Sequence, residues 1–413
     1  MNILVLATDI PATTNMPGSP RLFSICRLLA RRHRLTLLAF SSSEQRFEEF
    51  RADPSTHGIF ENIVVLPHAP APTWVGTQLH RLRLEPHFST RVRNRDYHDR
   101  ICRTIEETIV RGGFDVLYAD GLQCAQYVMD ATIRCAALMD LHDSLTLLYT
   151  RKAQLEDHWV EKLRLRAEMG SIARLERSLG SAFGTVVTNS EVDEQFLKTL
   201  APGLRTLTIG NGVDCDFFHP SAEIGDPHTL LFTGVMSYRP NADAAHYFAT
   251  DILPLVRRSD ANAEFHVVGK NPSEEVRALS SNEGVRVLGE VPDVRPHLVS
   301  AGIFVCPLRW GAGVKNKLLA ALAMEKPVVA TRQSVSGMHF VEGEHLLLAD
   351  DAADFASKVV RLMGDPAFAR RLGQAGRAFV LERYSWLSSA SEMENVLLGL
   401  VGARKDTPSP TAD

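Results

Sequence analysis

Short apolar runs alternate with longer amphipathic stretches along the chain. In the first half the apolar runs are NILVLA (2–7), RLTLLAF (34–40), NIVVL (62–66), FDVLYAD (114–120), CAALMD (135–140) and GTVVTNS (184–190). The stretch PRLFSICRLLARRH (20–33) has apolar residues at the i, i+3, i+4 spacing of a half-buried helix. Because the runs are continuously apolar, we expect strands buried on both faces of a parallel sheet that helices cover.

The same rhythm returns in the second half, after a stretch rich in Gly, Asp and Pro at 206–228. Here the apolar runs are TLLFTG (229–234), AEFHVVG (263–269), VRVLGEV (285–291), GIFVCPL (302–308), PVVAT (327–331) and HLLLAD (345–350). A chain of 413 residues is also long for a single hydrophobic core. The sequence therefore predicts an α/β fold with two tandem Rossmann-like domains, whose parallel sheets face a central cleft.

The domain boundaries follow from where this rhythm resets and where the composition changes. We place the first domain at 1–205 and the second at 206–383, followed by a C-terminal helix at 384–401. Residues 402–413 are polar and contain proline, so we expect a disordered tail.

Composition excludes several classes of protein. The formal net charge of −4 argues against general nucleic-acid binding. The six cysteines have no CxxC spacing and do not pair with histidines at zinc-finger spacing, so we expect reduced, buried thiols and no metal site. The opening MNILVLA lacks a basic segment, and no apolar run approaches the roughly 18 residues of a membrane span. We therefore expect a cytoplasmic protein.

One glycine turn has the features of an anion site. In WGAGVKNKLLAALAM (310–324), Gly311 and Gly313 allow close backbone approach, and a helix is expected to start directly after them. Lys315 and Lys317 add positive charge, which suits a phosphate or diphosphate. The segment matches neither the Walker A nor the GxGxxG pattern. A glycine turn with solvated lysines therefore remains the alternative.

Ligands of open parallel sheets bind beyond the carboxyl ends of the strands, where this sequence places several polar segments. The predicted strand 135–140 is followed by His142, which Asp140 and Asp143 flank. Either carboxylate could orient the imidazole, or Asp143 could cap the next helix. A packed or helix-capping role for the histidine remains open. Beyond the strand at 285–289, the segment EVPD begins with Glu290.

Four segments of the second half resemble one family. They are IGNGVDCDFFHP (209–220), FTGVMSYRPNADAAHYF (232–248), VLGEVPDVRPHL (287–298) and GAGVKNKLLAALAMEKPVVAT (311–331). They are similar to the GT-B glycosyltransferases, and more narrowly to family 4 (group 1) sugar transferases of the bacterial polysaccharide type. In the first half PGSPRLFSICRLLARRHRLTLLA (17–39) is compatible with the opening loop and helix of that family.

The resemblance implies a hexosyltransferase-like enzyme that moves a sugar from a nucleotide-diphosphate donor with retention of configuration. The second domain would hold the donor and the first domain the acceptor, which could be a glycan, a lipid-linked molecule or a small molecule. The helix at 384–401 would cross back to the first domain. Neither a metal nor a cofactor is implied, because basic side chains and a helix terminus would carry the diphosphate.

The resemblance also assigns residues. His142 would be catalytic and face the donor sugar. The acceptor-side loop would contain Gly18, Ser19 and Arg21. The donor-binding residues would be Gly311, Gly313, Lys315, Lys317, Glu290, Val291 and Arg239.

The chain departs from the family at two carboxylates. Family 4 enzymes usually carry Glu-x7-Glu across this helix start, where Ala312 and Ala320 stand here. We expect Ala320 at the beginning of a helix with its side chain toward the cleft. Alanine cannot accept a hydrogen bond from a ribose hydroxyl, a contact that contributes on the order of 1.5–3 kcal/mol. Val235 and Met236 stand where a basic residue is common.

Two arginine-rich segments, 81–100 and 151–179, add a question about partners. They could be solvated helix faces. They could also contact an anionic membrane surface or a lipid-diphosphate acceptor, which would make the protein peripheral to the inner membrane.

The sequence thus favours a nucleotide-sugar-dependent glycosyltransferase, with the lysines stabilising the diphosphate leaving group. The missing carboxylates motivate a second hypothesis, a catalytically weak nucleotide-sugar-binding partner of another glycosyltransferase. A sugar epimerase on the same fold is a third.

Overall fold

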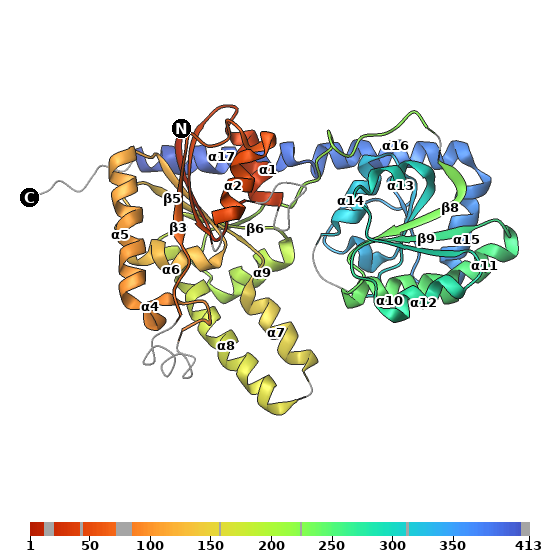
Figure 1. Ribbon diagram of the computed structural model, residues 1–413, viewed down its shortest axis with the longest axis horizontal. Helices are drawn as coiled ribbons and strands as arrows, with labels where there is room; N and C mark the ends of the chain where they lie inside the picture. Colours follow the sequence, from red (N-terminus) through yellow and green to blue (C-terminus); the bar gives the residue numbers. More distant parts are fainter. Residues whose placement is uncertain are drawn as a thin grey trace, which may run out of the picture. The chain divides into compact units, whose positions relative to one another are not determined.

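The computed structural model describes residues 1–11, 20–41, 44–71, 85–156, 158–223, 225–310 and 314–405. The chain divides into two compact units, of which unit 1 comprises residues 1–210 and 389–413 and unit 2 comprises residues 211–388 (Figure 1). Each unit is a parallel sheet covered by helices, which confirms the predicted α/β fold with two Rossmann-like domains.

Unit 1 is built on a seven-stranded parallel sheet with the strand order β3-β2-β1-β4-β5-β6-β7. Its strands are β1 Asn2–Ala7, β2 Arg34–Ser41, β3 Asn62–Pro67, β4 Val116–Asp120, β5 Ala136–His142, β6 Thr185–Thr188 and β7 Thr206–Thr208. Its helices are α1 Pro20–Leu29, α2 Glu44–Ala52, α4 Thr90–Arg93, α5 Arg95–Gly112, α6 Leu122–Asp130, α7 Leu145–Leu155, α8 Trp159–Ser178 and α9 Glu191–Leu200. The central strands β1 and β4 are almost entirely buried, because helices cover both faces of the sheet.

Unit 2 is built on a six-stranded parallel sheet with the order β10-β9-β8-β11-β12-β13. Its strands are β8 Asp226–Thr233, β9 Glu264–Val268, β10 Val285–Gly289, β11 Ala301–Cys306, β12 Val328–Ala330 and β13 Leu347–Leu348. Its helices are α10 Arg239–Tyr247, α11 Leu253–Ser259, α12 Glu274–Ala278, α13 Arg295–Ser300, α14 Asn316–Ala323, α15 Ala352–Gly364 and α16 Pro366–Arg383. Its core combines apolar residues of the strands with α14 and α15.

The chain passes between the units twice, at residues 210–211 and 388–389. In unit 1 the carbonyl of Gly210 accepts a hydrogen bond from Ser389 Oγ at 2.9 Å. In unit 2 the amide of Val213 donates to the carbonyl of Tyr384 at 2.7 Å. A Cβ on Gly212 would lie 2.4 Å from the backbone nitrogen of Trp386, so a side chain does not fit there. The two passages therefore run side by side within each unit.

The last helix, α17 Trp386–Lys405, includes residues 402–405, which were expected to belong to the tail. Residues 406–413 lie outside the described part of the chain. Within the described ranges, no helix combines the length and the apolar character that a membrane crossing requires. The six cysteines are free and five of them are buried, as the sequence predicted.

Candidate functional site

The candidate site of unit 2 lies at the carboxyl edge of its sheet, where the segments after β8 and β9 meet. A Cβ on Gly269 would lie 1.6 Å from the carbonyl oxygen of Gly234, so the two backbones touch only because position 269 is glycine. A Cβ on Gly234 would lie 2.7 Å from Nζ of Lys317 and 2.7 Å from the side-chain nitrogen Nδ2 of Asn241. The absence of a side chain at position 234 therefore makes room for the lysine.

Lys317 reaches this edge from the first turn of α14. Its Nζ donates a hydrogen bond to Oδ1 of Asn241 at 2.5 Å and lies 4.4 Å from the centre of the Phe232 ring. The side-chain nitrogen Nδ2 of Asn241 in turn donates to the carbonyl of Val235 at 2.9 Å. The ammonium is therefore held in one place by a polar side chain and an aromatic ring.

Burial makes this charge costly. Burial and, to a smaller extent, the nearby Lys315 ammonium lower the pKa of Lys317 to about 8, whereas Cys306 opposes the shift. Burial also lowers the pKa of Lys315, the N-cap residue of α14. Two lysines that are partly desolvated at the start of a helix form a site that an anion would stabilise.

The other donor-side predictions fall around the same edge. Glu290 directly follows β10 and is exposed, with its carboxylate 3.0 Å from Nζ of Lys270. Val291 is half-buried against the core of unit 2. Arg239 is exposed at the first position of α10. Gly311 and Gly313 lie outside the described residues.

Ala320 does not lie where the sequence analysis expected it. It occupies the middle of α14, the helix that begins at Asn316, and it is 8% exposed within the apolar core of unit 2. The expectation of a position at the helix start with an outward side chain is therefore wrong. α14 begins one turn before this residue, so Lys315 and Lys317 are the described donor-side predictions that lie near its N-terminus.

A hollow of about 420 Å³ also occurs in unit 2, but it lies away from the lysines. Its lining includes Val299 and Ser300, which precede the amino end of β11. It is therefore not at the edge where parallel sheets bind their ligands.

The candidate site of unit 1 lies at the carboxyl ends of β4 and β5. His142 is the last residue of β5, and its Nε2 lies 2.8 Å from Oδ1 of Asp120, the last residue of β4. The pairing of β5 with β6 shifts register between Asp140 and His142, and His142 has a φ of 68°. This left-handed conformation is costly for a residue with a Cβ and is typical of functional sites.

The carboxylate that contacts the imidazole of His142 is neither of the two that the sequence suggested, Asp140 and Asp143. It is Asp120, because β4 and β5 are adjacent parallel strands in which Asp120 pairs with Asp140, two residues before His142. Ser144, and not Asp143, caps α7 by accepting from the amide of Leu147. Burial alone would lower the pKa of His142, but the charge and the hydrogen bond of Asp120 outweigh it and raise that pKa to about 9. The imidazole is therefore protonated at neutral pH.

Arg21 was expected in a loop and instead lies in the first turn of α1, with 1% of its surface exposed. Its Nε donates to Oδ2 of Asp140 at 2.8 Å, and Tyr118 donates to the same oxygen at 2.7 Å. Its Nη1 donates to the carbonyls of Ile209 and Gly210 at 2.9 and 3.2 Å. Although burial opposes it, the Arg21 charge lowers the pKa of Asp140. Gly18 and Ser19, the other predicted residues of this loop, lie outside the described residues.

Asp120, Asp140 and His142 are close enough to one another to hold a metal ion. The Arg21 guanidinium is already bound to the Asp140 carboxylate, and the protonated His142 is bound to Asp120. Both cations repel a metal ion. This arrangement suits a fixed positive charge better than a metal centre.

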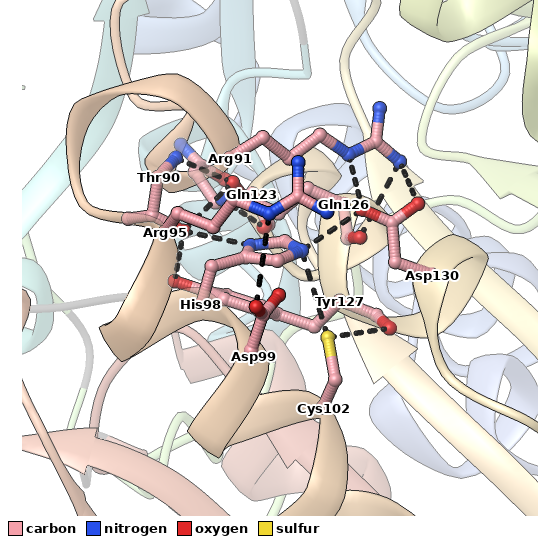
Figure 2. Close-up of polar contacts among 10 residues, drawn as sticks. All are labelled: Thr90, Arg91, Arg95, His98, Asp99, Cys102, Gln123, Gln126, Tyr127 and Asp130. Carbon is pink, nitrogen blue, oxygen red and sulfur yellow. Dashed lines mark hydrogen bonds and ion pairs between the residues drawn. The ribbon is translucent and has the colours of Figure 1, made fainter. Parts of the chain in front are cut away.

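A second polar network in unit 1 resembles a catalytic triad but has a different character (Figure 2). His98 contacts Oδ2 of Asp130 at 2.9 Å and Sγ of Cys102 at 3.5 Å through the same Nε2. Burial and the nearby Asp130 raise the pKa of Cys102 to about 12, so it remains a thiol. Arg91 donates two hydrogen bonds to Asp130. The network therefore ties α4, α5 and α6 together and is not a nucleophilic site.

The structure adds four residues that the sequence analysis did not select. They are Asp120, Gly234, Asn241 and Gly269. Each lies at or just beyond a predicted strand, except Asn241, which lies inside the segment FTGVMSYRPNADAAHYF that carried the resemblance. Their position beyond the strands was a usable signal, but their mutual contacts depend on the order of strands in the sheet.

In comparisons with known proteins, a family model matches part of unit 2. The family described as "Glycosyl transferases group 1" matches residues 227–365. A GDP-mannose-dependent alpha-(1-6)-phosphatidylinositol monomannoside mannosyltransferase of Mycolicibacterium smegmatis is 24% identical over 51% of this chain and 61% of its own length. An alpha-maltose-1-phosphate synthase of the same species is 28% identical over 51% of this chain and 62% of its own length. The chain therefore spans about three-fifths of the length of these curated relatives.

Solved structures match the whole fold. Sucrose-phosphate synthase of Thermosynechococcus elongatus superposes with a TM-score of 0.65 at 15% identity, covering 98% of this chain and 100% of that one. HepE of Anabaena, solved in complex with UDP, superposes with a TM-score of 0.63 at 14% identity, covering 97% of this chain and 100% of that one. At these identities the likeness establishes the two-domain fold.

Proposed function

We propose, because residues 227–365 match the family described as "Glycosyl transferases group 1", that the whole protein is a glycosyltransferase that uses a nucleotide-diphosphate sugar as donor. The observation that carries the proposal is the position of Lys317. Its desolvated ammonium lies at the carboxyl edge of the unit 2 sheet, beside the start of α14 and the glycine contact of the two neighbouring loops. A diphosphate bound there would place negative charge beside the Lys317 ammonium and so compensate for the water that burial removes from it.

The lysines are suited to the leaving group. When the bond between the anomeric carbon of the donor sugar and the diphosphate oxygen breaks, the diphosphate leaves with the electron pair and gains negative charge, which fixed cations stabilise in the transition state. Lys315 and Lys317 would supply these cations, together with backbone N–H groups at the start of α14. This role requires no metal, and metal independence is part of the proposal.

His142 is proposed as the catalytic residue of unit 1. A histidine with a pKa of about 9 is a poor general base at neutral pH. It would act as a cation and hydrogen-bond donor, with Nδ1 directed to the substrate because Nε2 contacts Asp120. Donation to a sugar hydroxyl or to developing negative charge is compatible with a retaining transfer.

The finer assignments rest on resemblance and on relatives. One relative is described as a GDP-mannose-dependent alpha-(1-6)-phosphatidylinositol monomannoside mannosyltransferase, and HepE was solved with UDP. We therefore propose a UDP or GDP sugar as donor and a glycan or lipid-linked acceptor, in polysaccharide biosynthesis at the cytoplasmic side.

A second candidate function is favoured by Ala320. The residue is 8% exposed in the core, so the position that holds a glutamate in the family offers no side chain that could hold a ribose. A protein with this gap could bind a nucleotide sugar weakly and support another glycosyltransferase without efficient turnover.

Turnover separates the two candidates. Purified protein is incubated with a panel of UDP and GDP sugars, with and without a lipid-linked acceptor extract, and the released nucleotide and the glycosylated product are measured by mass spectrometry. The glycosyltransferase proposal predicts acceptor-dependent release of nucleotide from one donor. Binding of a donor without release under any acceptor condition would favour the partner function, and neither binding nor release would contradict both.

A further inference from the structure

Helix α8 carries an exposed stripe that the proposed function does not use. Figure 1 shows α7 and α8 as a pair of adjacent helices that extends away from the sheet of unit 1. The stripe consists of Trp159, Leu163, Arg166, Gly170, Arg174 and Arg177, which follow one another at spacings of three or four residues and therefore share one face of the helix. We call this face the α8 stripe.

The stripe is apolar at one end and basic at the other. Trp159 and Leu163 are 73% and 60% exposed, which is unusual for large apolar side chains that are neighbours on a helix. The three arginines of the stripe are all exposed. The structure thus leaves a tryptophan and a leucine in water at the start of a helix whose outer face is otherwise cationic.

The carboxylates of α8 lie on its other faces. Glu161 contacts Arg164 at 3.3 Å. Glu168 is buried and accepts a hydrogen bond from the amide of His87, and Glu176 is buried and accepts from Ser144 Oγ at 3.0 Å. None of the three carboxylates of α8 therefore belongs to the stripe, which carries three arginines although the whole chain has a formal net charge of −4.

We propose that the α8 stripe docks the protein on an anionic lipid surface. An interfacial helix of this kind lies in the plane of the bilayer, with tryptophan and leucine inserted among the head groups and arginines next to the lipid phosphates. The proposal names the membrane partner of unit 1 and stands whether or not the protein transfers a sugar.

The anchoring of the hairpin connects this surface to the candidate site. His142 ends β5, and α7 begins at Leu145. Ser144 between them donates its Oγ to Glu176, near the end of α8. A bilayer in contact with the stripe would therefore lie along the helix pair that starts beside His142, where a lipid-linked acceptor would be presented.

The test is sedimentation of the full chain with vesicles. One set is phosphatidylcholine alone, and the other contains equal parts of phosphatidylcholine and phosphatidylglycerol. We expect binding to the anionic vesicles only, weakened by salt. Replacing the arginines (Arg166→Gln, Arg174→Gln and Arg177→Gln together) should weaken binding roughly a hundredfold, since each contributes about fivefold at such a surface. Trp159→Ala should weaken it roughly tenfold.

The matched control removes the same number of charges from the exposed face of α5. Arg100→Gln, Arg103→Gln and Arg111→Gln together change the net charge equally, and these arginines are also exposed. This variant should bind anionic vesicles as the unchanged protein does. Equal loss in both triple variants, undiminished binding of the stripe variant, or no binding of the unchanged protein would overturn the proposal, and the last result would leave the stripe to an acidic protein partner. Nucleotide titration of the same variants is a separate measurement, so failure of docking is distinguishable from failure of the proposed function.

Discussion

Replacing Lys317 by methionine separates a ligand-binding lysine from a structural one. Lys317→Met keeps a long side chain against the Phe232 ring but removes the ammonium. A hydrogen bond to a charged group contributes about 1.5–3 kcal/mol, so the dissociation constants of UDP and GDP should rise roughly ten- to a hundredfold. The free energy of unfolding should change little. The substitution relieves the desolvation that lowers the pKa of Lys317, and it leaves Oδ1 of Asn241 without this donor.

Lys326 offers a matched control in the same unit. Burial lowers its pKa to about 8 as well, but its Nζ donates to the carbonyls of Val299 and Ala301 at 2.9 and 3.0 Å. These groups lie at the amino end of β11, the edge opposite to Lys317. Lys326→Met should therefore leave nucleotide affinity unchanged and lower the free energy of unfolding, because two backbone carbonyls lose their donor.

Isothermal titration with UDP and GDP, paired with denaturant unfolding, measures both quantities for both variants. Affinity unchanged in Lys317→Met would refute the assignment of the diphosphate to this edge. Equal loss of affinity in Lys326→Met would show that the effect comes from general disturbance of unit 2.

Three further predictions concern protonation and the missing carboxylate. Nucleotide affinity should fall as pH rises through about 8, since free Lys317 loses its proton there, and constant affinity from pH 7 to 9 would contradict this. Binding near that pH should also take up a proton, which titrations in buffers of different ionisation enthalpy detect. The kcat of transfer at saturating donor should fall above about pH 9 as His142 loses its proton. Asp120→Asn should move this fall in kcat to lower pH, toward the ordinary histidine pKa of about 6.5, because the main group that raises the pKa of His142 is removed; an unmoved pH dependence would exclude His142 as its source. Ala320→Glu should lower the free energy of unfolding by about 1–3 kcal/mol and should not tighten UDP or GDP binding, because the added carboxylate enters a position that is 8% exposed. Tighter binding with unchanged stability would show instead that the side chain reaches the nucleotide.

The positions of most strands along the chain and the fold class were predictable, because each follows from the apolar runs. An apolar run such as NILVLA predicts a strand that is buried on both faces, as β1 and β4 are. The helical stretches between the runs predict that the strands are parallel. The start of α14 close to the lysines was also predictable, since Lys315 is its N-cap residue.

The contacts of the sites were not predictable in the same way. Asp120 and His142 are 22 positions apart in sequence and meet because β4 and β5 are neighbours in the sheet. The resemblance placed Arg21 in the acceptor-side loop, but its charge is satisfied in the interior by Asp140, a strand residue far along the chain. The burial of Ala320 was missed because its expected place came from the family's glutamate position and not from the helix itself, which begins at Asn316, close to where the sequence placed it.

The most direct test of the account is a crystal structure of the protein with UDP or GDP. The account predicts a nucleotide at the carboxyl edge of the unit 2 sheet, with a diphosphate oxygen within hydrogen-bonding distance of Lys317 Nζ and the base near the segment that follows β10. A nucleotide bound elsewhere, or one at this edge whose diphosphate does not contact Lys317, would contradict it.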